Sequence, residues 1–130
     1  MYPLLPVVAI SVGASVGALA RWGLALWLNP LASMPLGTLA ANLVGGYLIG
    51  ICMAVFQALP QLDPAWRLAL VTGFLGALTT FSSFSAEVVG MLQQQRYLLA
   101  LGTAAAHLLG SLLLTIVGLH NATFLIADRA

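Results

Sequence analysis

The chain has 130 residues, of which 62% are hydrophobic and 5% are charged, and its formal net charge is +1. Soluble domains carry roughly 25% charged residues, so this composition excludes an ordinary soluble fold with a polar surface. The chain has four arginines, no lysine and no basic run, and it therefore lacks the clustered cations that bind nucleic acids.

Four apolar segments account for most of the chain. A helix needs roughly 20 apolar residues to cross a hydrocarbon core of about 30 Å. We expect such helices at about 5–28, 37–58, 66–92 and 98–120. Residues 1–130 are therefore predicted to form a single all-α transmembrane domain. The alternative, a helical bundle in a soluble protein, would need polar outer faces on its helices.

The first segment lacks the basic leader and the small-residue cleavage site of a signal peptide, so we expect it to remain as a helix. Its residues 13–17 match G-x-S-x-G, the serine hydrolase pattern, with Ser15 in the nucleophile position. That motif requires a strained turn between a strand and a helix, beside a histidine base. Here it lies within an apolar run, and we interpret Gly13 and Gly17 as a helix-packing surface.

The second segment carries an amide in an otherwise apolar run. Asn42 lies about six residues inside the segment, or roughly 9 Å deep at 1.5 Å per residue. Its side chain offers two N–H donors. Gly46 and Gly50 have the spacing of a second packing surface. Cys52 is the sole cysteine, which excludes an internal disulfide.

The third segment follows Asp63-Pro64, a pattern that predicts a helix N-cap with proline in the first turn. Near its midpoint, Gly73 and Gly76 precede a run of hydroxyl residues over 79–85. Such side chains compete for backbone hydrogen bonds, and a break in the helix is predicted here. Irregular backbone at this depth must be buried or line a cavity, where its carbonyls can bind a cation. A straight helix whose hydroxyls bond to the preceding turn is the alternative.

Two phenylalanines follow the proposed break. Phe81 and Phe84 are three residues apart, so they share one face of a helix. Spacing alone favours packing against lipid or other helices. However, an aromatic ring has a positive edge, and such an edge can face a desolvated anion without a buried charge.

The fourth segment carries a polar stripe. His107, Ser111 and Thr115 are spaced four residues apart and lie along one face of a helix. Gly102, Gly110 and Gly118 recur every eight residues on another packing face. A histidine in a membrane helix is more often a hydrogen-bonded packing residue than a proton relay, but the stripe as a whole favours a polar path.

Charged residues occur near the ends of the segments. Arg21 and Glu87 fall on the same side of the membrane as the entrance to Asn42. They can pair with each other, anchor the helices at the interface, or line a vestibule in which Arg21 attracts anions.

The arginines give no orientation by the positive-inside rule. Arg67 and Arg129 fall on the side of the termini, and Arg21 and Arg96 on the other. The chain can therefore insert both ways and pair as an antiparallel dimer. The alternative is that other factors fix one orientation.

These motifs together resemble the Fluc/CrcB family of fluoride channels, which are small bacterial membrane proteins, and the resemblance covers essentially the whole chain. The matching motifs are GALARW at 17–22, GTLAANLVG at 37–45, GFLGALTTFSSFSAE at 73–87, and Gly110-Ser111 with Thr115. The motif at 73–87 is the most specific of them.

The resemblance implies an antiparallel, dual-topology homodimer in the bacterial inner membrane, with two pores that pass fluoride and exclude chloride. Fluoride would leave the cell passively, which relieves its toxicity. The resemblance implies no enzymatic activity, no organic cofactor and no nucleic-acid partner; the expected partners are fluoride, a second copy of the chain and the lipid bilayer.

The resemblance also implies roles for individual residues. Asn42 would donate to fluoride, and Phe81 and Phe84 would present ring edges along the pore. The fluoride pathway and its vestibule would be completed by Thr80, Ser111, Thr115, Arg21 and Glu87.

A structural sodium ion is implied as well, held at the dimer axis by backbone carbonyls of Gly76 and Thr79 from both subunits. Two positions depart from the family pattern. Ala77 replaces a usual glycine, which reduces the backbone freedom beside the break. Ser83 replaces a usual threonine and keeps the hydroxyl.

The alternative function is that of a small four-helix exporter that couples protons to drug efflux. Such an exporter needs a carboxylate deep in the membrane, but the first segment has none and Glu87 lies near an end. A small, strongly hydrated anion instead needs several weak donors that replace its water. The third possibility, an intramembrane serine hydrolase with Ser15 and His107, depends on the motif that we interpret as packing.

Overall fold

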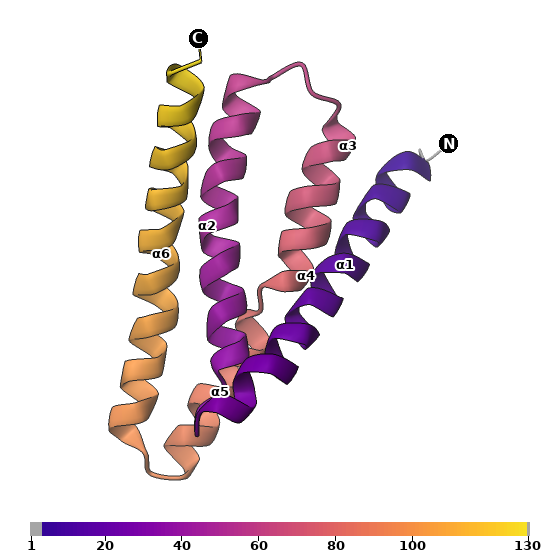
Figure 1. Ribbon diagram of the computed structural model, residues 1–130. Helices are drawn as coiled ribbons and strands as arrows, with labels where there is room; N and C mark the ends of the chain where they lie inside the picture. Colours follow the sequence, from indigo (N-terminus) through magenta and orange to yellow (C-terminus); the bar gives the residue numbers. More distant parts are fainter. Residues whose placement is uncertain (1–3, 130) are drawn as a thin grey trace.

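The structure is a computed structural model that describes residues 4–129 as an all-helical bundle (Figure 1). The first two long helices are α1 (Leu4–Leu28) and α2 (Leu36–Ala58), joined by a short 3₁₀ turn at Asn29–Leu31. A third helical segment runs over Pro64–Gln93, and α6 (Tyr97–Ala127) completes the bundle. All four are long and apolar enough to cross a membrane. In Figure 1 both ends of the chain lie at the same end of the bundle, as an even number of passes requires.

The observed helix ends agree with the expected ones except at the last. Helix α6 continues to Ala127, whereas the apolar run suggested an end near 120. Polar residues end the run but not the helix, because their side chains find partners without breaking it. Thr123 bonds back to the carbonyl of Leu119 at 2.8 Å, and Asn121 donates to the Tyr47 hydroxyl at 3.3 Å.

The third segment is divided into several pieces. It consists of α3 (Pro64–Arg67), a π-helix (Leu68–Leu75), α4 (Gly76–Leu78) and α5 (Phe81–Gln93). The predicted N-cap is confirmed, since an Asp63 carboxylate oxygen accepts the N–H of Ala65 at 2.8 Å. The π-helix was not predicted. Its wider turns, with bonds from residue i to i+5, are rare and are often found at functional sites.

The predicted break lies between α4 and α5. Thr79 and Thr80 are extended, with φ/ψ of −82°/156° and −151°/119°. The Thr80 hydroxyl accepts the N–H of Ser83 at 3.1 Å and so caps α5. The straight-helix alternative is therefore wrong. One bond that it proposed is present, because the Thr79 hydroxyl bonds back to the Leu75 carbonyl at 2.8 Å.

Glycines bring two pairs of helices into close contact. Gly13 and Gly17 of α1 lie against carbonyls of the π-helix, at Ala69 and Phe74. Helix α2 packs along α6, where Gly50 lies against the Thr115 carbonyl. Small residues allow this approach in membrane helices. Both predicted packing surfaces are thus confirmed.

The third predicted glycine surface, along the last helix, is only partly correct. Gly118 lies against the Tyr47 carbonyl and Gly110 against the Leu43 side chain. A methyl group at Gly102, in contrast, would meet no atom within 4 Å. The eight-residue repeat fails there because eight residues exceed two α-helical turns by about 80°, so that Gly102 faces nearly away from the side of Gly118.

The buried core lies beside the break. Ala41, Leu75 and Leu78 pack together, with Ala20 and Leu24 of α1 around them. This cluster joins α1, α2 and the third segment. It therefore fixes the position of Thr79 and Thr80 against the polar face of α2.

Candidate functional site

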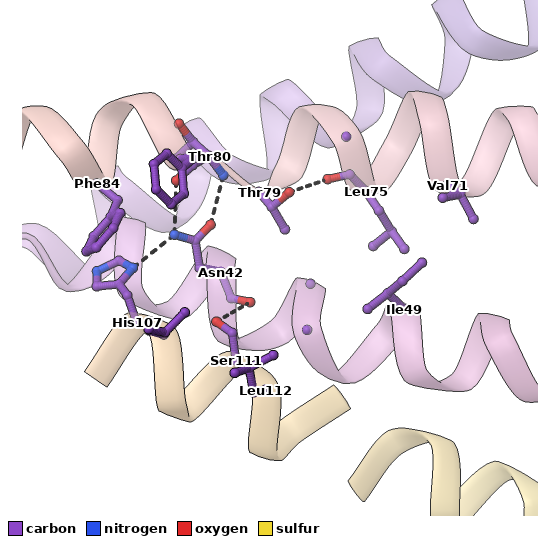
Figure 2. Close-up of a pocket in the computed structure, with 15 residues that line it drawn as sticks. Asn42, Ile49, Val71, Leu75, Thr79, Thr80, Phe84, His107, Ser111 and Leu112 are labelled. Atoms are coloured by element: carbon purple, nitrogen blue, oxygen red, sulfur yellow. Dashed lines mark hydrogen bonds between the residues drawn. The ribbon is translucent and has the colours of Figure 1, made fainter. Parts of the chain in front are cut away.

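A groove of about 440 Å³ runs along one face of the bundle, beside the break (Figure 2). Its walls come from α2, from the third segment on both sides of the break, and from α6. Most of the lining is apolar or aromatic. The side chains that bring polar atoms to it are Asn42, Thr79, Thr80, His107 and Ser111.

Asn42 bonds to the backbone at the point where the break interrupts the hydrogen bonds of the helix. Its Oδ1 accepts the N–H of Thr80 at 2.8 Å, and its Nδ2 donates to the Thr80 carbonyl at 3.1 Å (Figure 2). One side chain of α2 thus satisfies both backbone groups of a residue that no helix covers. Unpaired, each of these groups would cost about 1–3 kcal/mol.

The second hydrogen of the Asn42 amide faces α6. Nδ2 lies 2.9 Å from Nδ1 of His107, whose side chain is only 4% exposed. The His107 ring packs against Phe84, with ring centroids 4.5 Å apart at 32°. Both amide hydrogens of Asn42 are therefore engaged within the protein.

The two phenylalanines contact each other beside the groove. Phe81 and Phe84 meet edge to face, with centroids 5.4 Å apart and ring planes at 69°. Phe84 is half-buried against His107, whereas Phe81 is 77% exposed. The rings therefore form a continuous aromatic wall from the protein interior to its surface.

The stripe on α6 ties that helix to α2. The Ser111 hydroxyl donates to the Asn42 carbonyl at 3.5 Å. The Thr115 hydroxyl lies 2.9 Å from the carbonyls of both Gly46 and Ser111. Ser111 lines the groove, while Thr115 lies one turn beyond it and does not belong to its lining.

Arg21 and Glu87 do not pair with each other. Arg21 donates from Nε to the Ala77 carbonyl at 3.2 Å and from a terminal nitrogen to the Ser83 hydroxyl at 3.4 Å. It thus bridges the last turn before the break and the first turn after it. The ion pair considered from the sequence fails because the break offers Arg21 closer acceptors.

Glu87 faces α2 instead. The Thr38 hydroxyl donates to its Oε1 at 2.5 Å. Its Oε2 is buried and has no hydrogen-bond partner within residues 4–129. Neither Arg21 nor Glu87 belongs to the lining of the groove.

The break also releases two carbonyls. In a continuous helix the N–H of Thr80 would bond to Gly76, but it donates to Asn42 instead. The N–H of Ser83 would likewise bond to Thr79, but it donates to the Thr80 hydroxyl. Gly76 is also exposed. Two hard oxygen donors therefore lie close together in the sequence without their helical partners.

Comparison with known proteins gives a clear family assignment. Residues 8–119 match the family described as CrcB-like protein, Camphor Resistance (CrcB). The chain belongs to the CrcB family. The resemblance noted from the motifs is thereby confirmed.

Several relatives of this CrcB chain carry the same name. A protein of Albidiferax ferrireducens is 76% identical over 124 residues, which cover 95% of each chain, and is named fluoride-specific ion channel FluC. Proteins of Variovorax paradoxus and Pseudomonas aeruginosa have that name at 68% and 53% identity. Those matches cover 95% and 92% of this chain, and 99% and 95% of the relatives.

Sequence reasoning missed how the site residues of this CrcB chain are connected. It identified Asn42 and His107 separately, from depth and from helical spacing, but not the hydrogen bond between them. It also missed Thr38 as the partner of Glu87. Thr38 and Asn42 are four residues apart, so they share a face of α2. That spacing was the signal available for Thr38.

Proposed function

We propose that this chain is a passive, fluoride-selective channel of the bacterial cytoplasmic membrane, which exports fluoride and so relieves its toxicity. It is a multi-pass membrane protein and an ion channel rather than an enzyme, as its family and its FluC relatives indicate. The observation that carries the proposal is the groove beside the break. Uncharged donors and ring edges line it in the middle of the apolar span.

The chemistry of the groove suits a small anion. Fluoride loses strongly bound water on entry, so a pathway must offer several weak replacements and no site that traps the ion. Asn42, Thr80 and Ser111 supply amide and hydroxyl groups, and Phe81 and Phe84 supply positive ring edges. No lysine or arginine belongs to the lining described.

The remaining polar residues extend this pathway. Thr115 continues the track along α6 one turn beyond Ser111. Arg21 and Glu87 form a vestibule at the other side, where the half-buried guanidinium raises the local anion concentration. Its hydrogen bonds to Ala77 and Ser83 hold the charge beside the break, so it attracts the ion without lying in its path.

The working unit of the channel is an antiparallel dual-topology homodimer. Two observations support this assembly. The groove is open on one side, where Phe81 is 77% exposed and Gly76 is also exposed. Arg67 and Arg129 flank the spans at one end of the bundle, and Arg96 lies at the other end with Arg21 near it. A chain whose arginines favour neither orientation can insert both ways across the membrane. A second, inverted copy can then close the groove.

A structural sodium ion at the dimer axis is part of the proposal. The fit rests on the carbonyls of Gly76 and Thr79, whose helical donors bond elsewhere. Unwound carbonyls in broken membrane helices coordinate sodium. Ala77 does not disturb this donor set, because it lies in the helical turn α4 and adopts no conformation that favours glycine. The ion would join the two broken helices of the dimer.

Removal of sodium therefore weakens the dimer. Purified protein is dialysed against a buffer in which a large organic cation replaces sodium. We expect the dimer fraction and the fluoride flux to fall together, and both to return when sodium is added back. Size-exclusion chromatography and efflux measurements follow the two quantities. If neither changes, the sodium site does not exist in this protein.

The function itself is tested in liposomes. Protein-containing vesicles loaded with potassium fluoride are diluted into fluoride-free buffer, and a fluoride electrode records efflux after potassium permeability is supplied. We expect rapid efflux without a proton gradient, and no efflux from vesicles loaded with chloride. Protein-free vesicles are the control. Fluoride retention equal to that control overturns the proposal, and flux that requires a proton gradient favours the exporter alternative.

Both phenylalanines take part in conduction. Replacement of Phe81 or Phe84 by isoleucine keeps an apolar wall but removes the positive ring edge. We expect each variant to lower fluoride efflux by about tenfold, the equivalent of about 1.4 kcal/mol in the barrier. Phe124→Ile is the matched control, since Phe124 is exposed on α6 away from the groove. Unchanged efflux in both groove variants would exclude the rings from the mechanism.

A further inference from the structure

The proposed function gives no role to His107. Of the side chains that bond to Asn42, however, that of His107 is the closest, with Nδ1 2.9 Å from the amide nitrogen. Figure 2 shows its ring beside Phe84 with one nitrogen directed at the Asn42 amide. The ring is 4% exposed, and it lines the groove from α6. It therefore contacts two of the residues along which the ion is proposed to pass.

The hydrogen bonds fix the protonation of this ring. The Asn42 atom that accepts the Thr80 N–H must be oxygen, so the other atom of the amide is nitrogen. That nitrogen has only donors, one of which goes to the Thr80 carbonyl. The other points at Nδ1 of His107, 2.9 Å away. Nδ1 is therefore an acceptor without a proton, and the ring proton lies on Nε2.

This arrangement has a consequence for an anion at Asn42. The amide keeps Thr80 in place through Oδ1 and one hydrogen, so the hydrogen that it can offer an ion is the one now held by His107. When an anion arrives, this amide hydrogen must give up its bond to Nδ1 of His107 and bond to the anion instead. The net gain is the difference between the two bonds, and it is smaller than the gain from a free N–H.

We propose that His107 is a positioning residue that acts through Asn42. It satisfies the second amide hydrogen when no ion is present and lowers the affinity of Asn42 for fluoride. Conduction needs such weak sites, because an ion that binds too tightly does not leave. His107 thus sets the balance between binding and release at Asn42. This inference rests on the proposed fluoride pathway, and it adds the group that tunes one of its sites.

The test compares His107→Leu with His107→Gln. Leucine cannot accept the Asn42 hydrogen, which becomes free for the ion. We expect the fluoride concentration for half-maximal flux to fall by about fivefold to tenfold, together with a fall in maximal flux. Glutamine offers an acceptor oxygen and should restore both values toward those of the wild type. His120→Leu, at an exposed position of the same helix, is the matched control and should change neither.

A merely structural role gives a different pattern. Loss of packing lowers the maximal flux of His107→Leu and leaves the half-maximal concentration unchanged, a result that would overturn the inference. If wild-type protein passes no fluoride, the proposed function fails, and a spectroscopic measurement still decides the role of His107. Nitrogen NMR of the wild type should show Nδ1 of His107 without a proton, with a resonance that shifts when fluoride is added. A protonated Nδ1, or a resonance that fluoride does not move, contradicts the exchange.

Discussion

Replacement of Asn42 by leucine abolishes fluoride efflux and loosens the break in the third segment. Leucine has the same branched shape as asparagine, but it removes the three hydrogen bonds that the amide makes to Thr80 and His107. The Thr80 N–H and carbonyl then lack partners in an apolar span. With each group costing about 1–3 kcal/mol, we expect a loss of about 3 kcal/mol in the free energy of unfolding. Efflux and denaturant unfolding measure the two effects.

A second variant separates conduction from stability. Asn42→Asp keeps an oxygen that accepts the Thr80 N–H, but it has no amide hydrogens and adds a negative charge that repels an anion. We expect it to lose efflux and to keep more of the stability than the leucine variant. Asn121→Leu is the matched control, since Asn121 is exposed and makes one bond, to Tyr47. Substantial efflux from Asn42→Leu would exclude the amide from the pathway.

Gly118→Ala is expected to separate α6 from α2. A methyl group at this position would overlap the backbone carbonyl of Tyr47, which cannot move without shifting α2. Overpacking of this kind costs about 1–3 kcal/mol. Because the groove is formed between these helices and the break, fluoride efflux should fall with stability. Thermal unfolding in detergent and efflux from liposomes measure both.

The control for this substitution lies on the same helix. Gly102→Ala meets no atom within 4 Å, and alanine stabilises a helix relative to glycine by about 1 kcal/mol. We therefore expect unchanged or slightly raised stability and unchanged efflux. If Gly102→Ala destabilises the protein as much as Gly118→Ala does, the close contact with Tyr47 is not the reason for glycine at position 118.

The long helices could be predicted because a membrane span is defined by length and hydropathy. Those quantities placed seven of the eight helix ends to within two residues. They failed at the end of α6, where exposed Asn121 and Thr123 find local partners. The break was predictable because hydroxyl residues cluster after Gly76. The π-helix at Leu68–Leu75 was not predicted. Its carbonyls lie against Gly13 and Gly17 of α1, a contact between helices that the sequence of the segment does not record.

The site was predictable residue by residue but not as a network. Depth indicated Asn42, and helical spacing indicated Phe84 and Ser111, all of which line the groove. Hydrogen bonds among them depend on how α2 and α6 are aligned. That alignment comes from close contacts at Gly46 and Gly50 of α2 and at Gly118 of α6. The bonds of Arg21 across the break and of Glu87 to Thr38 depend in turn on how α1 and α2 meet the third segment, which the sequence alone does not show.

The π-helix at Leu68–Leu75 allows one more residue between the Asp63 cap and the break than a regular α-helix would. An α-helix turns by about 100° per residue, and a π-helical stretch takes up an extra residue by widening its turns. Deletion of one residue within this segment would therefore restore regular α-helix and leave Thr80 facing Asn42. Insertion of one residue would instead rotate everything that follows by about 100°, and Thr80 would point away from Asn42. The segment therefore tolerates a deletion better than an insertion.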